Sequence, residues 1–135
     1  MHIGFFDGAC RGNPGPSSYG TVILDNALNE VHNDKRYIGT ATNNEAEYSG
    51  LINLLECAIE KGIQSIAIKG DSLLVIRQMT KVYAVRKENL TPLYRKAVEL
   101  SKKIRHVHFT HVPREQNKRA DELANQALDE AQKQN

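Results

Sequence analysis

An aspartate stands where the buried face of the first predicted strand would continue. Ile3, Phe5 and Asp7 are spaced two residues apart, so their side chains point to the same face of an extended chain. Ile3 and Phe5 favour a core, whereas an aspartate at the end of a buried face is costly unless it is hydrogen-bonded, paired or bound to a cation. The chain then enters a turn rich in glycine and proline at residues 8–16. The fold must therefore provide partners for Asp7 from elsewhere in the chain.

The hydrophobic pattern of the remaining chain predicts an α/β fold. A helical apolar pattern starts after Thr42-Asn43-Asn44 and stops at Gly62, which is typical of a long helix. Three strands in series, followed by helices that alternate with strands, favour an antiparallel meander with later strands added in parallel beside the first. We expect one domain over residues 1–135, with a five-stranded mixed sheet flanked by helices. The strands are predicted at residues 2–9, 19–25, about 30–40, 63–70 and 106–112, and the further helices at 73–79, 91–104 and 116 to about 133.

The composition is that of an ordinary globular domain. The chain has 135 residues, of which 40% are hydrophobic and 25% are charged. Its net charge is only +2, so any nucleic-acid binding would have to come from local basic patches. Two cysteines are too few for a disulfide scaffold, and Cys57 lies on the apolar face of the long helix, as a core residue would. With no secretory leader and no apolar run of about 20 residues, we expect a cytoplasmic monomer without membrane contact.

Four predicted elements each place a carboxylate at the end of an inward face. Besides Asp7, Glu47 lies one turn before the apolar face of the long helix, Asp71 closes the fourth strand, and Asp121 begins the core-facing stripe of the last helix. Taken singly, each acid has an ordinary structural explanation. Glu47 could complete a capping box opened by Asn44, Asp71 could cap the helix that follows it, Asp121 could favour a helix dipole, and Asp7 could cap a turn.

Together, the four acids favour a cation site at the mouth of one sheet. Carboxylates that lie close together repel each other unless a cation neutralises them. Oxygen ligands without histidine or thiolate partners select Mg²⁺ or Mn²⁺ over zinc. Two such ions about 4 Å apart serve in-line phosphoryl displacement, in which one activates water and the other stabilises the leaving oxygen.

Four segments in the right order and spacing resemble ribonuclease HI over essentially the whole chain. They are residues 7–16 (DGACRGNPGP), 42–47 (TNNEAE), 71–72 (DS) and 117–124 (NKRADELA). The resemblance implies the ribonuclease H-like fold and a metal-dependent endonuclease that cleaves the RNA strand of RNA–DNA hybrids, leaving 5′-phosphate and 3′-hydroxyl ends. It also implies that Asp7 bridges two metal ions, that Glu47 and Asp71 hold the leaving-group ion, and that Asp121 helps to hold the ion carrying the nucleophilic water. The family's Thr-Asn-Asn-x-x-Glu spacing selects Glu47, not Glu45.

The same resemblance implies contacts with the substrate. Glycines in the turn after Asp7 allow close approach of the backbone, and a helix N-terminus favours phosphate. Short donors and acceptors there could recognise the 2′-hydroxyl that distinguishes RNA from DNA. Asn43 and Asn44 could equally be helix-capping residues, and both roles are compatible. The implied contacts are Gly8, Cys10 and Asn13 with the RNA sugars and minor groove, Thr42 and Asn43 with a DNA phosphate, and Asn44 with a base edge or sugar.

The loop before the last helix departs from the best-known bacterial form of the family. That form has a mobile histidine in a longer loop, whereas here the strand runs through His111 and Pro113 into a short loop that begins with Arg114. His111 matches by its distance from Asp121, but Arg114 better occupies the loop position. The pattern is similar to the archaeal-type branch, in which an arginine assists catalysis. We therefore expect Arg114 to assist the reaction, with His111 as the alternative.

A second departure concerns the segment from Arg77 to Thr91. Bacterial relatives carry a tryptophan-rich basic protrusion there, and this chain has no tryptophan. A solvated connection and a phosphate-binding patch are both compatible with the sequence of this segment. If this segment binds phosphates of the hybrid, we expect the binding to be weak and strongly salt-dependent. The candidate contacts are Lys81, Tyr83, Arg86 and Lys87.

Two other classes of function are compatible with parts of the sequence. One is another nuclease of the same fold that acts on double-stranded RNA or on DNA, and the other is an inactive hybrid-binding module. The glycine-rich turn and the full-length resemblance argue against the first alternative. The four intact carboxylates argue against the second.

Overall fold

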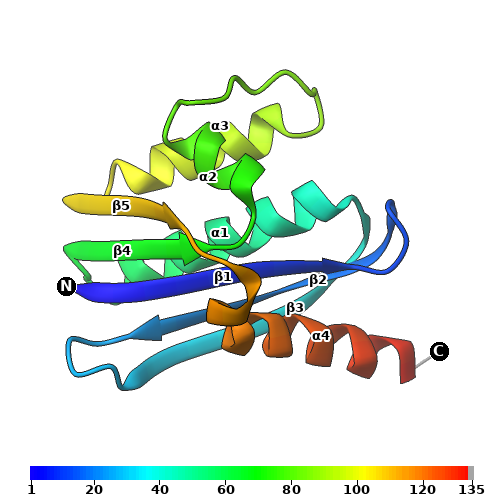
Figure 1. Cartoon of the computed structure of the whole chain (residues 1–135), viewed down its shortest axis with the longest axis horizontal. Helices are drawn as coiled ribbons and strands as arrows, with labels where there is room; N and C mark the ends of the chain where they lie inside the picture. Colours follow the sequence, from blue (N-terminus) through cyan, green and yellow to red (C-terminus); the bar gives the residue numbers. More distant parts are fainter. Residues whose placement is uncertain (134–135) are drawn as a thin grey trace.

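The computed structural model describes residues 1–133 and has one mixed sheet with helices on both faces. The strand order is β3-β2-β1-β4-β5 (Figure 1), which confirms the predicted α/β class and five-stranded sheet. The strands are β1 (His2–Cys10), β2 (Gly15–Leu24), β3 (Glu30–Ala41), β4 (Ser65–Gly70) and β5 (His106–His111). The helices are α1 (Asn43–Glu60), α2 (Leu73–Met79), α3 (Thr91–Ser101) and α4 (Lys118–Lys133), and a 3₁₀ turn, η1 (Arg114–Gln116), precedes α4.

Pairing in the sheet follows the predicted scheme. β1 pairs antiparallel with β2, and β2 pairs antiparallel with β3. β4 joins the other side of β1 in parallel, and β5 pairs in parallel with β4. No helix within residues 1–133 is long and apolar enough to cross a membrane.

Several element boundaries differ from the predicted ones for local reasons. β2 begins at Gly15, four residues early, because the end of the glycine- and proline-rich turn already pairs with Ala41 of β3. α1 stops where predicted, since Gly62 adopts a φ of 71° that favours glycine. α3 begins one residue before Pro92 and ends at Ser101, and β5 ends at His111, one residue early. The last helix starts at Lys118, because residues 114–116 form the 3₁₀ turn.

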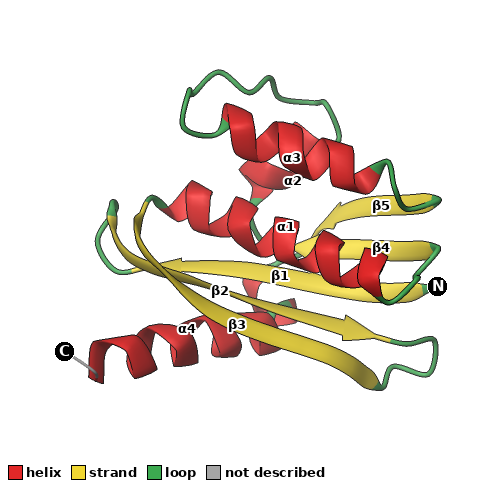
Figure 2. Ribbon diagram, turned by 180° about the vertical axis from the view of Figure 1, so that it is seen from behind, coloured by secondary structure: helices red, strands yellow, loops and turns green. Residues whose placement is uncertain are grey.

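The two faces of the sheet are covered by different helices (Figure 2). α1 covers one face so closely that a Cβ at Gly4 would lie 2.9 Å from a methyl carbon of Leu54. α4 covers the other face, where a Cβ at Gly20 would lie 2.7 Å from the backbone nitrogen of Ala124. Side chains alternate along a strand, so Asp7, which pairs with Gly20, points to the α4 side.

The main core lies between α1 and the sheet, on the opposite face of β1 from the one predicted. Phe6 is fully buried there, whereas Ile3 and Phe5 are only half-buried on the α4 side. The prediction that Ile3 and Phe5 lead into the core was wrong, because the Phe6 face is the one that α1 covers. Cys57 is half-buried and packs against this core, close to the predicted position. The core side chains from the other elements include Leu51, Leu54 and Leu55 of α1 and Ile66 and Ile68 of β4.

Candidate active site

The sheet opens between β1 and β4 at the point where their parallel pairing ends. The last pair is Phe6 with Gly70, so Asp7 and Asp71 are the next residues along the two strands. β1 continues alongside β2 as far as Cys10, while the chain after β4 turns into α2. Such divergence at the carboxyl ends of strands is where open α/β sheets bind ligands. The two carboxylates therefore reach the opening because of the fold itself.

Other residues complete the hydrogen bonds that the diverging strands leave open. The side-chain amide of Asn117 donates to the carbonyl oxygen of Phe6 at 2.9 Å. On the other side of β4, the backbone N–H of Val112 donates to the carbonyl oxygen of Gly70 at 2.9 Å and extends the pairing of β4 with β5. Asn117 is 1% exposed, so its bond to Phe6 is shielded from water. The backbone at the point where β1 and β4 diverge is therefore held in place by hydrogen bonds.

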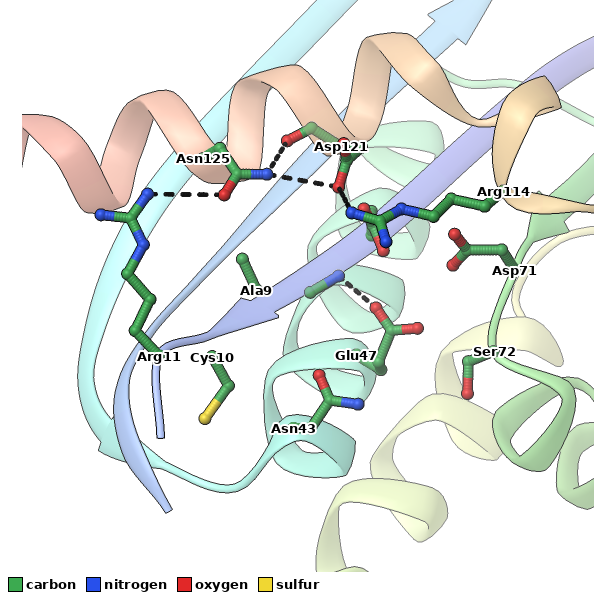
Figure 3. A pocket seen from close by; sticks show the side chains of 12 residues that line it. Ala9, Cys10, Arg11, Asn43, Glu47, Asp71, Ser72, Arg114, Asp121 and Asn125 are labelled. Carbon is green, nitrogen blue, oxygen red and sulfur yellow. Dashed lines mark hydrogen bonds and ion pairs between the residues drawn. The ribbon is translucent and has the colours of Figure 1, made fainter. Parts of the chain in front are cut away.

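Glu47 reaches the same opening from α1 (Figure 3). Carboxylate oxygens of Asp7, Glu47 and Asp71 all lie within 4.8 Å of one another, and no histidine or cysteine of the described residues joins this cluster. Asp7 is 5% exposed and Glu47 is 4% exposed. The backbone N–H of Gly8 donates to the Glu47 carboxylate. Glycine is required there, since a Cβ on Gly8 would lie 2.5 Å from the backbone nitrogen of Glu47.

The caps of the neighbouring helices leave these acids free. The N-cap of α1 is Thr42, whose hydroxyl accepts from the N–H of Glu45 at 3.2 Å, while the Glu45 carboxylate accepts from the N–H of Thr42 at 2.8 Å. The capping box is therefore Thr42–Glu45, and the alternative in which Asn44 and Glu47 form it is wrong. In the same way, Ser72 caps α2 by accepting from the N–H of Val75 at 3.3 Å. Asp71 therefore does not cap α2.

Asp121 approaches from the opposite side of the opening, on the first turn of α4. Its backbone N–H donates to the carbonyl of Asn117 at 3.1 Å, which fixes the helix start beside β1. Its side chain lines the same cleft and contributes to the raised pKa of Asp7, although it is not part of the cluster of three. Nη2 of Arg114 is 3.8 Å from its Oδ1, and the guanidinium extends over the opening in Figure 3.

The buried acids hold their protons more tightly than free carboxyls do. Burial, followed by the charges of Glu47 and Asp71, raises the pKa of Asp7. Burial raises the pKa of Glu47 as well, and the charge of Asp71 adds to this effect. The cluster is therefore unfavourable as a set of bare carboxylates at neutral pH, and a bound cation would favour its ionised form.

A cleft of about 480 Å³ surrounds the acids and contains some of the other predicted residues. Gly8, Cys10, Asn43 and Arg114 line it. Arg11 and Asn125 also line it, and the sequence reasoning did not select them. Arg11 lies within the glycine- and proline-rich turn, and Asn125 lies one helical turn after Asp121, so spacing alone could have indicated both.

The remaining predicted residues do not line this cleft. Asn13 accepts a hydrogen bond from the backbone N–H of Asn43 at 2.9 Å, which ties the turn after β1 to the start of α1. His111 is exposed at the end of β5. The guanidinium of Arg77 stacks over the ring of Tyr83 at 5.5 Å in the exposed connection after α2. Substrate contact by Asn13, His111 and Tyr83 stays a prediction, as it does for Thr42, Asn44, Lys81, Arg86 and Lys87.

Known proteins resemble this chain along most of its length. A family model described as "Reverse transcriptase-like" matches residues 5–127. Ribonuclease HI of Halobacterium salinarum is 44% identical over 94% of this chain, and the chain spans 64% of that relative's length. A relative from Mycobacterium bovis is 43% identical, and the chain spans 35% of its length.

Solved structures agree with this relationship. The crystal structure of RNase H1 from Halobacterium salinarum NRC-1 superposes with a TM-score of 0.93 at 43% identity, over 96% of this chain and 98% of that one. LC11-RNase H1, isolated from compost and solved in complex with an RNA/DNA hybrid, gives a TM-score of 0.92 at 39% identity, over 97% of this chain and 99% of that one. The similarity to the halobacterial protein agrees with the archaeal-type branch that the loop before α4 indicates. The chain therefore belongs to the ribonuclease H family.

Proposed function

We propose that this protein is an endonuclease that hydrolyses the RNA strand of RNA–DNA hybrids, using two divalent cations and leaving 5′-phosphate and 3′-hydroxyl ends. The observation that carries the proposal is the meeting of the Asp7, Glu47 and Asp71 carboxylates within 4.8 Å, in a cleft that Asp121 also lines. LC11-RNase H1, which matches 97% of this chain, was solved in complex with an RNA/DNA hybrid, and this supports the choice of substrate.

The donor set fits hard divalent cations. The cluster offers only carboxylate oxygens, which Mg²⁺ and Mn²⁺ prefer, and burial of like charges makes it favourable to neutralise them. We assign Asp7 to both ions, Glu47 and Asp71 to one, and Asp121 to the other. When bound, such a pair of ions activates water and stabilises the leaving oxygen.

The chain's own groups would orient the hybrid around this cluster. The close packing of Gly8 against α1 brings the backbone of the turn after β1 to the edge of the cleft, where it can approach the RNA sugars. Asn43 lines the cleft at the N-terminus of α1, an end that favours a phosphate. We assign Gly8, Cys10 and Asn13 to the RNA strand, and Thr42, Asn43 and Asn44 to the DNA strand.

Arg114 is the better candidate than His111 for the group that assists catalysis. The Arg114 side chain is 78% exposed, lines the cleft and lies 3.8 Å from Asp121. Such a guanidinium can stabilise negative charge that develops on a phosphate, and it needs no proton transfer to do so. His111 lies at the end of β5 and is not among the residues that line the cleft.

A substrate panel tests the proposed function. Labelled RNA–DNA hybrid, RNA–RNA duplex, DNA–DNA duplex and both single strands are incubated with Mg²⁺, Mn²⁺ or EDTA. We expect metal-dependent cleavage of the RNA strand of the hybrid alone, with loss of activity in Asp7→Asn. Cleavage of DNA or of double-stranded RNA would favour another nuclease of this fold. Tight hybrid binding without cleavage in either metal would indicate a binding module.

A further inference from the structure

Asn125 links Asp121 to Arg11, in the turn after β1, through hydrogen bonds. It lies on α4, four residues after Asp121, and its side chain is half-buried. The Nδ2 group donates to the backbone carbonyl of Asp121 at 2.9 Å and to its carboxylate Oδ1 at 3.2 Å. On the other side, Nη2 of Arg11 donates to Oδ1 of Asn125 at 3.5 Å. Figure 3 shows this chain of contacts along one wall of the cleft.

The chemistry of the two neighbours allows only one orientation of the Asn125 amide. A guanidinium can donate hydrogen bonds but cannot accept them, and an ionised carboxylate can accept but cannot donate. The amide oxygen must therefore face Arg11, and the amide nitrogen must face Asp121. Arg11 is itself held, because it pairs with Asp129 at 2.7 Å and bonds to Gln132.

Asp121 needs such support more than Asp7 and Glu47 do. Its side chain is 31% exposed, whereas Asp7 and Glu47 are 5% and 4% exposed and are held by packing. It also has a competing partner, since Nη2 of Arg114 is 3.8 Å from the same Oδ1. Without the amide, the carboxylate could turn towards Arg114 and away from Asp7. A bond to Oδ1 restricts this rotation and leaves the second oxygen for a cation.

We propose that Asn125 is a positioning residue, which orients the Asp121 carboxylate so that Asp121 and Asp7 can hold a divalent cation between them. The proposal rests on the proposed function, because it assumes that Asp121 binds a cation. Groups that orient metal ligands through hydrogen bonds typically change metal affinity by about 10- to 100-fold when they are removed. Arg11 contributes indirectly to the same arrangement, because it fixes the orientation of the Asn125 amide.

The test compares Asn125→Ala and Asn125→Leu with Gln126→Ala. Gln126 is the adjacent residue on α4, and its amide contacts Glu122 and Lys35 instead of the carboxylates of the cleft. Mn²⁺ binding to the free protein is measured by titration calorimetry, and the Mn²⁺ concentration for half-maximal cleavage is measured with hybrid. In both Asn125 variants we expect about tenfold weaker binding of one ion and a similar rise in the half-maximal concentration. We expect the KM for hybrid at saturating Mn²⁺ to be unchanged, and Gln126→Ala to behave as wild type.

Two results would overturn the proposal. Mn²⁺ dependence like that of wild type in both measurements would show that Asn125 makes only a helix contact. A raised KM with unchanged Mn²⁺ dependence would show that Asn125 contacts the substrate directly. If wild type itself fails to cleave the hybrid, the proposed function fails, and the calorimetric comparison still reports on Asn125.

Discussion

The two sides of the cleft hold their acids by different means. On the side of β1, β4 and α1, Asp7 and Glu47 are buried, and their positions follow from the sheet register and the packing of α1 on Gly8. On the α4 side, the Asp121 side chain is 31% exposed, its carboxylate accepts a hydrogen bond from the Asn125 amide, and its backbone N–H donates to the carbonyl of Asn117. We call these the packed side and the bonded side. The difference implies that changes on the packed side affect both stability and activity, whereas changes on the bonded side affect activity alone.

Asp7→Asn should give the largest effect on activity. The change removes a ligand that we assign to both ions, so we expect cleavage to fall by a factor of at least about 10³. Cleavage of labelled hybrid in Mg²⁺ and in Mn²⁺ measures this. Activity within tenfold of wild type in either metal would contradict the assignment of Asp7.

The same variant should be more stable than wild type when metal is absent. The folded state raises the pKa of Asp7 above its unfolded value of about 3.9, so it binds a proton that the unfolded state releases. This contribution is fully present below about pH 4 and is lost as the pH rises towards the folded pKa. We therefore expect Asp7→Asn to exceed wild type by roughly 1–3 kcal/mol at pH 8, and by less at pH 5.

Urea unfolding in EDTA at several pH values measures the difference. Glu47 also has a raised pKa, so the variant should retain part of the pH dependence. Added Mg²⁺ should stabilise wild type and reverse the order. A wild-type protein whose metal-free stability does not fall between pH 5 and pH 8 would contradict burial as the cause of the raised pKa.

Gly8→Ala tests whether packing holds Glu47. The new Cβ would lie 2.5 Å from the nitrogen of Glu47 and 2.6 Å from the backbone carbon of Ala46, so α1 would have to shift. We expect a loss of about 1–3 kcal/mol in stability and about 100-fold in turnover. Gly4→Ala is the matched control on the same face of β1, because the three atoms nearest to its Cβ would be side-chain ends of Leu54 and Ile66, which can move more easily than backbone. Equal activity losses in the two variants would indicate general destabilisation.

Arg114→Ala should separate the bonded side from the packed side. An exposed ion pair contributes little to stability, so we expect unfolding within about 0.5 kcal/mol of wild type. Turnover should fall by roughly 10- to 100-fold if the guanidinium stabilises the transition state. His111→Ala should lose less than threefold. Equal losses, or a larger loss in His111→Ala, would reject Arg114 as the assisting group.

The positions of the acids on both sides were predictable from sequence, but the hydrogen bonds of the bonded side were not. Strand alternation and the ends of the apolar stripes predicted all four acids, including Asp121 on the bonded side, because the same periodicity determines both the core and the position of these acids. The order of the strands also followed from the pattern of elements. The buried face of β1 could not be predicted in this way. Alternation defines two faces of the strand, and the packing of α1 determines which of them is covered.

The bonded side depends on contacts between residues far apart in the sequence. The contact of Arg11 with Asn125 joins a turn to a helix more than a hundred residues later, and no local pattern encodes it. The capping box at Thr42 and Glu45 was local, yet two overlapping choices of cap fitted the sequence. Local chemistry identified the helix start correctly, but the geometry was needed to select the capping pair.

The smallest expected effect lies outside both sides, in the connection between α2 and α3. Lys81, Arg86 and Lys87 are exposed there, so their combined change to alanine should leave folding and turnover at saturating hybrid unchanged. If they contact phosphates, the slope of log affinity against log salt should become less negative by about 1 to 3. Binding of hybrid to an Asp7→Asn background, measured between roughly 50 and 200 mM salt, gives that slope.

The matched control removes the same charge at a distance from the cleft. Lys102, Lys103 and Arg105 are also exposed, and they precede β5 at the end of the sheet opposite to the acids. Because both triple variants lower the net charge by three, a general field effect would change the two slopes equally. A change confined to the Lys81, Arg86 and Lys87 variant would indicate direct phosphate contact. A slope equal to that of wild type would mean that this connection is only solvated, and that the cleft alone supplies the phosphate contacts.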